Sequence, residues 1–136
     1  MKILFDTNLL VPAWLYKNGV CAKAYDKAVN DKNISLFVCT HILGEFLKTC
    51  NEKFPDKMDK IQLFLNDMLT KAKLIKTPPE RERIPEEDLI RDIDDRPVLR
   101  AAIAAEIDII VTGDKDFLEA GLTNIKVISP AEFLKL

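Results

Sequence analysis

Residues 2–6 read Lys-Ile-Leu-Phe-Asp, an apolar run that ends in an acid. Three more short apolar runs follow, at Ile34–Cys39, Ile107–Val111 and Ile125–Ile128. Runs this short, rich in β-branched residues and without polar alternation, are typical of parallel strands that are covered on both faces. The first run therefore predicts the opening strand of a parallel sheet.

Helical patterns separate these runs. Apolar residues spaced by three and four predict helices that contain Ile42 to Cys50 and Met58 to Leu69, and we expect further helices over Cys21–Asn30 and Pro97–Glu106. The segment Thr77–Ile90 holds prolines among alternating Arg and Glu, and we expect a surface connection there. The alternation of strand and helix predicts an α/β fold with a central parallel sheet and helices on both faces.

The bulk properties set limits on the function. A chain of 136 residues that is 48% hydrophobic can bury a sizeable core, so we expect a single domain over residues 1–136. A net charge of −2 gives no strong electrostatic footprint for nucleic acid. No apolar run approaches the roughly 18 residues of a membrane span, and the start turns acidic too soon for a signal peptide. We therefore expect a cytoplasmic protein.

Four acids are placed at one edge of the predicted sheet. Asp6 and Asp114 follow the first and third strands, Asp95 precedes the helix that leads into the third, and Glu45 is near the start of the helix after the second. In open α/β sheets, ligands bind at the edge where the strands have their carboxyl ends. Carboxylates gathered there would repel one another without a cation, so the pattern predicts a site for Mg²⁺ or Mn²⁺. Such an ion activates water and neutralises phosphate charge, which favours hydrolysis of a phosphodiester.

Each acid also has an ordinary structural interpretation. Asp95 and Asp114 could simply cap the N-termini of the elements that follow them. Asp6 could close a turn with the next two residues. Glu45 points away from the apolar stripe of its helix, so periodicity alone predicts a solvated side chain. The residues by themselves leave these alternatives open.

Several enzyme classes lack the residues they need. His41 is the single histidine, which excludes a two-histidine acid–base mechanism of RNA cleavage. No glycine-rich phosphate loop is present, so nucleotide-driven motors and dinucleotide oxidoreductases are excluded. No G-x-S-x-G motif is present for a serine hydrolase. We expect His41 to be a residue in the first turn of a helix, without a catalytic role.

Four motifs carry a resemblance to a known family. They are Phe5-Asp6-Thr7-Asn8-Leu9-Leu10, then Thr40 to Glu45 with Glu45-Phe46-Leu47, then Asp92-Ile93-Asp94-Asp95 before Pro97-Val98-Leu99, and Val111-Thr112-Gly113-Asp114-Lys115-Asp116-Phe117. Together they resemble a PIN domain, in particular the bacterial and archaeal branch related to the VapC-type toxins of toxin–antitoxin systems. The match is spread over residues 3–134. The resemblance implies a flavodoxin-like parallel sheet and an endoribonuclease that cleaves single-stranded or structured RNA.

The resemblance also implies roles for individual residues. It implies that Asp6, Asp95 and Asp114 hold the metal ion and that Glu45 is the fourth acid of the catalytic set, with Asp94 in reserve for Asp95. The residues that would support this set are Asn8, Thr112, Asp92, Asp94 and Asp116. In the family the partner is commonly a small antitoxin protein, and homodimers are frequent.

Three other functions stay open. A haloacid-dehalogenase-like phosphatase also has an acid after its first strand, but it needs a second acid two residues later, where this chain has Asn8. A response-regulator receiver domain needs paired acids after the first strand, and only Asp6 is available. The third alternative is a catalytically silent PIN fold that binds RNA or protein. The four intact acids argue against it.

Overall fold

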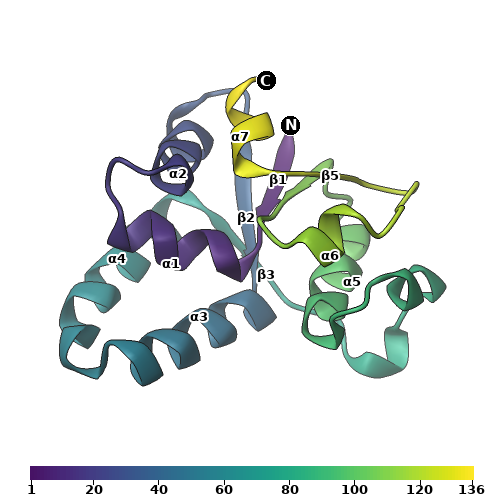
Figure 1. Ribbon diagram of the computed structural model, residues 1–136, viewed down its shortest axis with the longest axis horizontal. Helices are drawn as coiled ribbons and strands as arrows, with labels where there is room; N and C mark the ends of the chain where they lie inside the picture. Colours follow the sequence, from purple (N-terminus) through teal and green to yellow (C-terminus); the bar gives the residue numbers. More distant parts are fainter.

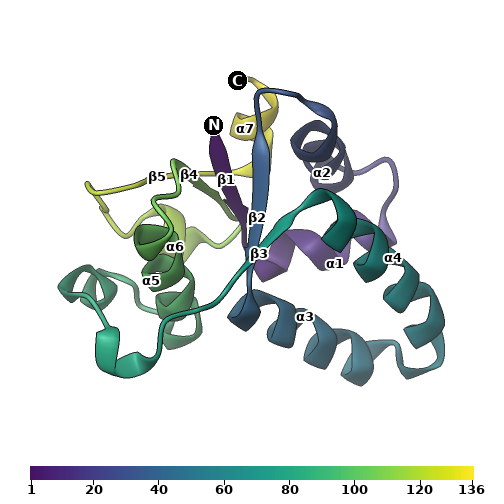
Figure 2. The same ribbon diagram turned by 180° about the vertical axis from the view of Figure 1, so that it is seen from behind.

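The computed structural model describes residues 1–136, in which a five-stranded sheet lies between two layers of helices (Figures 1 and 2). All strands are parallel and follow the order β3-β2-β1-β4-β5, which confirms the predicted α/β fold class. The strands are β1 Lys2–Phe5, β2 Ser35–Cys39, β3 Lys73–Ile75, β4 Ile109–Val111 and β5 Lys126–Ile128. The helices are α1 Thr7–Leu15, α2 Val20–Asn30, α3 Thr40–Lys53, α4 Met58–Lys71, α5 Arg96–Ala104, α6 Lys115–Leu118 and α7 Pro130–Leu134.

The strand order decides on which face each helix lies. From β1 through β2 to β3 the chain moves outward in one direction, and it then returns past β1 to form β4 and β5. Because crossovers between parallel strands are right-handed, a reversal of direction sends the connecting helices to the opposite face. Helices α1 to α4 accordingly cover one face, and α5 and α6 cover the other, as both views show (Figures 1 and 2).

The core lies on both sides of β1, the central strand. Ile3, Leu4 and Phe5 are 0% exposed, and they belong to a cluster of 33 buried apolar residues. Strand β1 pairs with β2 and β4, so that Ile3 is aligned with both Leu36 and Ile109. A strand with neighbours on both sides and helices on both faces has no polar surroundings, which is why its sequence shows no alternation.

The predicted strands match β1, β2, β4 and β5 within two residues, and the predicted helices match α2 to α5. Strand β3 was not predicted. It has only three residues, and it forms through its pairing with β2, where Leu74 is aligned with Val38. Helix α1, which starts directly after Asp6, was not predicted either and carries Pro12 inside it.

The segment between β3 and α5, residues 76–95, contains neither strand nor α-helix, as expected for a connection. It forms the short 3₁₀ turns η2 Glu80–Glu82, η3 Pro85–Leu89 and η4 Ile93–Asp95. A buried ion pair ties this segment to α5, because the Arg100 guanidinium donates to Glu87 at 2.8 and 3.2 Å and to the Pro78 carbonyl at 2.9 Å.

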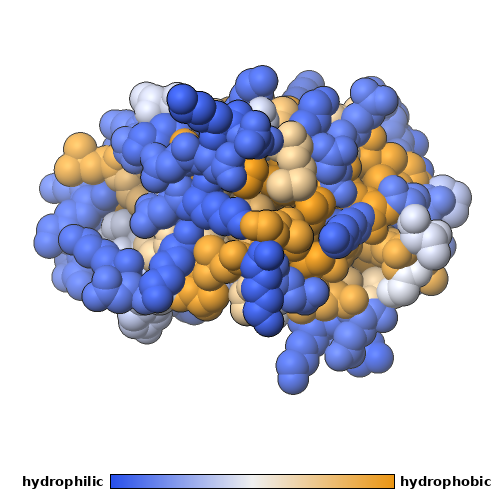
Figure 3. Space-filling model, turned by 90° about the horizontal axis from the view of Figure 1, so that it is seen from above, coloured by the Kyte–Doolittle hydropathy of each residue, from blue (hydrophilic) through white to orange (hydrophobic).

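The face of the molecule seen in Figure 3 mixes hydrophilic and apolar areas. Figure 3 looks onto the side where the chain ends after α7, and apolar areas there are broken up by hydrophilic side chains. None of the helices combines the length and the apolar character that crossing a membrane would take.

Candidate metal centre

A cleft of about 400 Å³ opens at the carboxyl ends of β1 and β4. It is lined almost entirely by polar side chains, and the four acids predicted for the catalytic set, Asp6, Glu45, Asp95 and Asp114, all lie in it. Its further lining residues are Thr7, Asn8, Val11, Pro12, Thr49, Lys53, Asp92 and Asp94. The topology thus brings residues from four separate stretches of the chain to one place.

Asp6 is at the bottom of this cleft and is only 2% exposed. Its Oδ1 accepts a hydrogen bond from the Thr7 amide at 2.7 Å, and its Oδ2 accepts one from the Thr112 hydroxyl at 2.8 Å. Burial raises the pKa of Asp6 from 3.8 to about 6, although both hydrogen bonds lower it; the charges of Glu45 and Asp114 raise it further. The carboxylate is therefore costly to ionise until a positive charge is near.

Hydrogen bonds connect the loop after β1 with the loop after β4. The Thr112 hydroxyl, which donates to Asp6, also accepts from the Asp114 amide at 3.1 Å. Asn8 accepts from the Gly113 amide at 3.1 Å, and its own amide donates to Thr112 at 3.4 Å. Asp6 and Asp114 are therefore held at a fixed separation by two side chains that were expected in supporting roles.

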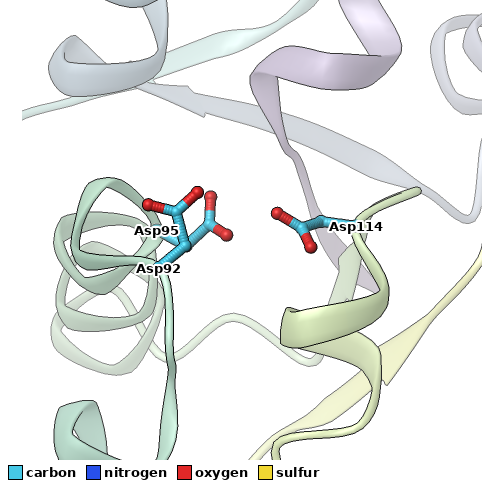
Figure 4. Close-up of side chains that lie close together, drawn as sticks. All are labelled: Asp92, Asp95 and Asp114. Atoms are coloured by element: carbon cyan, nitrogen blue, oxygen red, sulfur yellow. The ribbon is translucent and has the colours of Figure 1, made fainter.

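Three carboxylates face one another across the cleft. Asp92 and Asp95 approach from the segment before α5, and Asp114 approaches from the start of α6 (Figure 4). One carboxylate oxygen of each lies within 4.8 Å of the others. Asp6 is a neighbour of this group through the Thr112 bridge, but it is not one of the three. Asp92, expected only in a supporting role, thus lies in the closest group.

Asp95 stands out among these acids. It occupies the N-cap position of α5, yet its side chain caps no amide of the helix, so the capping interpretation is wrong for this residue. It is 7% exposed, and its Oδ2 is buried without any hydrogen-bond partner. A buried oxygen without a partner is costly unless something binds it.

The same surroundings shift the titration of Asp95. Burial raises the pKa of this carboxyl far above its ordinary value, and a hydrogen bond with Asp114 and the negative charges of Asp6, Asp114 and Asp92 raise it further. Asp114, by contrast, does cap its helix, because its Oδ1 accepts from the Asp116 amide at 2.9 Å. Its capping and its place in the cleft are compatible.

The residues present fit a divalent cation. The facing atoms are all carboxylate oxygens, the donors that Mg²⁺ and Mn²⁺ prefer, and the unpartnered Oδ2 of Asp95 leaves one donor free. A cation would also remove the repulsion that raises the pKa values of Asp6 and Asp95. The arrangement can hold a hard metal ion beside an open cleft.

A family model described as "PIN domain" matches residues 2–116 of the chain. This chain belongs to the PIN-domain family. Curated protein sequences give no match to it at a significant level.

Solved structures share the PIN-domain fold at low sequence identity. VapBC2 from Rickettsia felis, bound to a DNA fragment from its promoter, is 18% identical with a TM-score of 0.70, and the match covers 95% of this chain and 98% of that one. DNA-bound VapBC from Salmonella typhimurium is 11% identical with a TM-score of 0.69, covering 96% and 98%. The sarcin-ricin-loop-cleaving toxin VapC20 from Mycobacterium tuberculosis is 16% identical with a TM-score of 0.61, covering 90% and 98%.

Two expected residues of the PIN domain lie outside the closest group. Asp94 is exposed at the rim of the cleft, and its carboxylate does not join Asp92, Asp95 and Asp114. Asp116 does not line the cleft, and its carboxylate lies 3.9 Å from the Arg91 guanidinium. The geometry therefore favours Asp95 over Asp94 at the position that the sequence left open.

Periodicity alone did not find two polar residues of α3 that lie at the cleft. Glu45, which only the resemblance placed in the catalytic set, is half-buried and accepts from the Thr7 hydroxyl at 3.2 Å. His41 is in the first turn of its helix, as expected, and it lies 3.1 Å from the Glu45 carboxylate and 2.8 Å from the Asp94 carbonyl. A side chain that faces a polar cleft has the same pattern in sequence as one that faces water, so periodicity could not distinguish them.

Proposed function

We propose that this PIN domain is an Mg²⁺- or Mn²⁺-dependent endoribonuclease that hydrolyses phosphodiester bonds of single-stranded or structured RNA. The observation that carries the proposal is the Asp95 carboxylate, which has a buried, unpartnered Oδ2 and lies close to Asp92 and Asp114 in an open cleft. When bound there, a divalent ion lowers the pKa of an attacking water and neutralises charge on the phosphate. A bound cation would also offset the negative charge of the six acids in the cleft, which otherwise repels a polyanion.

The residues of the cleft would have different roles in this reaction. Asp92, Asp95 and Asp114 would hold the ion, with Asp6 next to them through Thr112, and this extends the expected set of Asp6, Asp95 and Asp114. Asn8 and Thr112 orient Asp6 and Asp114 through the hydrogen bonds described above. Glu45, on the opposite wall, is placed to accept a proton from a water that attacks the phosphate. Asp94 and Asp116 take no direct part.

The geometry does not support a phosphatase that uses Asp6 as a nucleophile. Such a residue must be reached by a phosphate, whereas Asp6 is 2% exposed and both of its oxygens accept hydrogen bonds. Asn8, which stands where a second acid would be needed, is engaged with Gly113 and Thr112. A silent binding module would not need to keep a costly buried carboxylate such as Asp95.

We further propose that the enzyme is the toxin of a toxin–antitoxin pair in the cytoplasm. Two of the similar structures are VapBC complexes and a third is a sarcin-ricin-loop-cleaving toxin, which supports this view by analogy of fold. A small antitoxin protein would be the partner, and a homodimer is compatible with it. The test is growth arrest on expression of the chain, relieved by co-expression of a small adjacent reading frame.

The nuclease is tested with a matched pair of neighbouring acids. Asp95→Asn should abolish cleavage of a single-stranded RNA in Mn²⁺. Asp94→Asn, the same substitution at an exposed neighbouring acid, should leave cleavage intact. EDTA should stop the wild-type reaction. Release of phosphate from small monoesters without RNA cleavage would contradict the proposal, as would RNA binding that is indifferent to metal and to Asp95→Asn.

A further inference from the structure

The two walls of the cleft are built in different ways. Asp6 and Asp114 follow adjacent parallel strands, and the Asp6 amide still donates to the Val111 carbonyl of β4 at 3.0 Å. Asp92 and Asp95 belong to the segment of residues 76–95, which pairs with no strand. The position of these two carboxylates therefore depends on side-chain contacts.

Most contacts of this segment lead to its own side of the molecule. Arg100 of α5 holds Glu87 and Pro78, and the Arg96 guanidinium donates to the Ile90 carbonyl at 3.0 Å. These bonds fix the segment to the start of α5, but they do not set its distance from the opposite wall. The Arg91 guanidinium lies 3.9 Å from the Asp116 carboxylate of α6, but its side chain is 86% exposed, so this ion pair holds the segment only weakly. A firmer hold needs a hydrogen bond across the cleft.

His41 makes this crossing contact. Its Nε2 lies 2.8 Å from the backbone carbonyl of Asp94, the residue directly before Asp95. Because a carbonyl oxygen can only accept, Nε2 carries the hydrogen and donates it. The same nitrogen lies 3.1 Å from Oε1 of Glu45, one turn further along α3. A single N–H of His41 therefore lies between the Glu45 side of the cleft and the Asp92–Asp95 segment.

The base of the imidazole is itself fixed in place. The His41 amide donates to the Thr77 hydroxyl at 3.1 Å, and the Thr77 amide donates to the Thr40 hydroxyl at 3.0 Å. Thr77 thus caps the first turn of α3 from the residue stretch after β3, since Cys39 at the N-cap offers no side-chain bond. The backbone of His41 is thus held at the edge of the sheet, and its side chain reaches from there to the Asp92–Asp95 segment.

We propose that His41 is a positioning residue, which holds the Asp92–Asp95 segment against α3 and so sets the distance of Asp95 from Asp114. The inference rests on the proposed metal-dependent nuclease, whose acids it would orient. The three carboxyl groups lie within 4.8 Å of one another, and any negative charge on them favours a wider separation of the two walls. A hydrogen bond from the opposite wall opposes that movement.

The experiment compares His41→Leu, which removes the N–H, with His41→Gln, whose side-chain amide can donate at similar reach. Lys48→Leu, an exposed change on the same helix outside the cleft, is the control. Mn²⁺ affinity is measured by calorimetry, RNA cleavage by kcat and KM, and backbone flexibility by amide hydrogen exchange of the metal-free protein. We expect His41→Leu to weaken Mn²⁺ binding about 10- to 100-fold, as is typical when an outer hydrogen bond of a metal site is lost.

The hydrogen-exchange arm separates this inference from the proposed function. His41→Leu should speed exchange at residues 93–96 and leave β1 and β4 unchanged, and His41→Gln should restore most of the protection and of the Mn²⁺ affinity. Wild-type affinity and exchange in His41→Leu would overturn the inference, and so would a glutamine variant no better than the leucine variant. A wild-type protein that binds no divalent ion would contradict the nuclease, yet the exchange comparison would still decide the role of His41.

Discussion

Raising the pH from 5 to 8 in EDTA should destabilise the metal-free protein, because the folded state binds a proton that the unfolded chain has already released. The pKa of Asp6 is raised by burial from 3.8 to about 6, so its stabilising contribution is complete below the unfolded value and is lost as the pH rises through the folded one. The whole shift corresponds to about 3 kcal/mol of the free energy of unfolding. About half of this loss falls between pH 5 and pH 8, and the raised pKa of Asp95 acts with the same sign.

Metal should reverse this loss, and more strongly at high pH. At a concentration 100 times its dissociation constant, an ion that binds only the folded state adds about 2.7 kcal/mol. At pH 5 only about a tenth of Asp6 is ionised in the metal-free fold, so the apparent affinity should be about tenfold weaker than at pH 8.

The assay is urea unfolding at both pH values, with EDTA or with Mn²⁺, for the wild type and for Asp6→Asn. Between pH 5 and pH 8 the variant should lose about 1.4 kcal/mol less than the wild type in EDTA, because it lacks the titrating group. A wild-type stability that is flat or rises with pH in EDTA would refute the reasoning, and so would an equal gain from Mn²⁺ at both pH values.

Three further predictions concern other parts of the molecule. Arg100→Met should lower the free energy of unfolding in urea by about 3–5 kcal/mol, because it leaves the buried Glu87 carboxylate unpaired. Adding Glu87→Gln should recover much of this loss, and additive losses in the double variant would contradict the prediction. Phe46→Ala, at a site 0% exposed in the core, should cost about 3–5 kcal/mol, and a change under about 1 kcal/mol would mean that the helix packs differently. Lys53 lines the cleft without an ion-pair partner, so Lys53→Ala should raise KM for RNA. It should also lower the slope of log binding constant against log salt concentration by about 0.7. Lys48→Ala, a change at an exposed lysine outside the cleft, should alter neither quantity.

The parts of the fold that sequence could predict are those in which local pattern and tertiary surroundings agree. Strand β1 is apolar throughout because it is covered on every side, and α3 and α4 show a helical stripe because one face of each is buried. Strand β3 carries no such signal. Two of its three residues are exposed, and it is a strand only because β2 offers it a partner.

The candidate site was predictable in so far as topology places residues at strand ends. Asp6 and Asp114 follow β1 and β4, so the parallel sheet alone brings them to one edge. The place of Asp92 depends instead on how an irregular segment turns before α5, and the contact of His41 depends on the distance between two walls. Such distances are set by packing among residues far apart in the chain, and no short pattern encodes them.

The sheet ends on both sides in a strand of three residues, and each of these strands begins with an exposed lysine, Lys73 on one side and Lys126 on the other. A foreign strand that tried to add to either side would gain few backbone bonds and would have to desolvate an ammonium group. Both edges of the sheet therefore disfavour polymerisation by strand addition at high concentration.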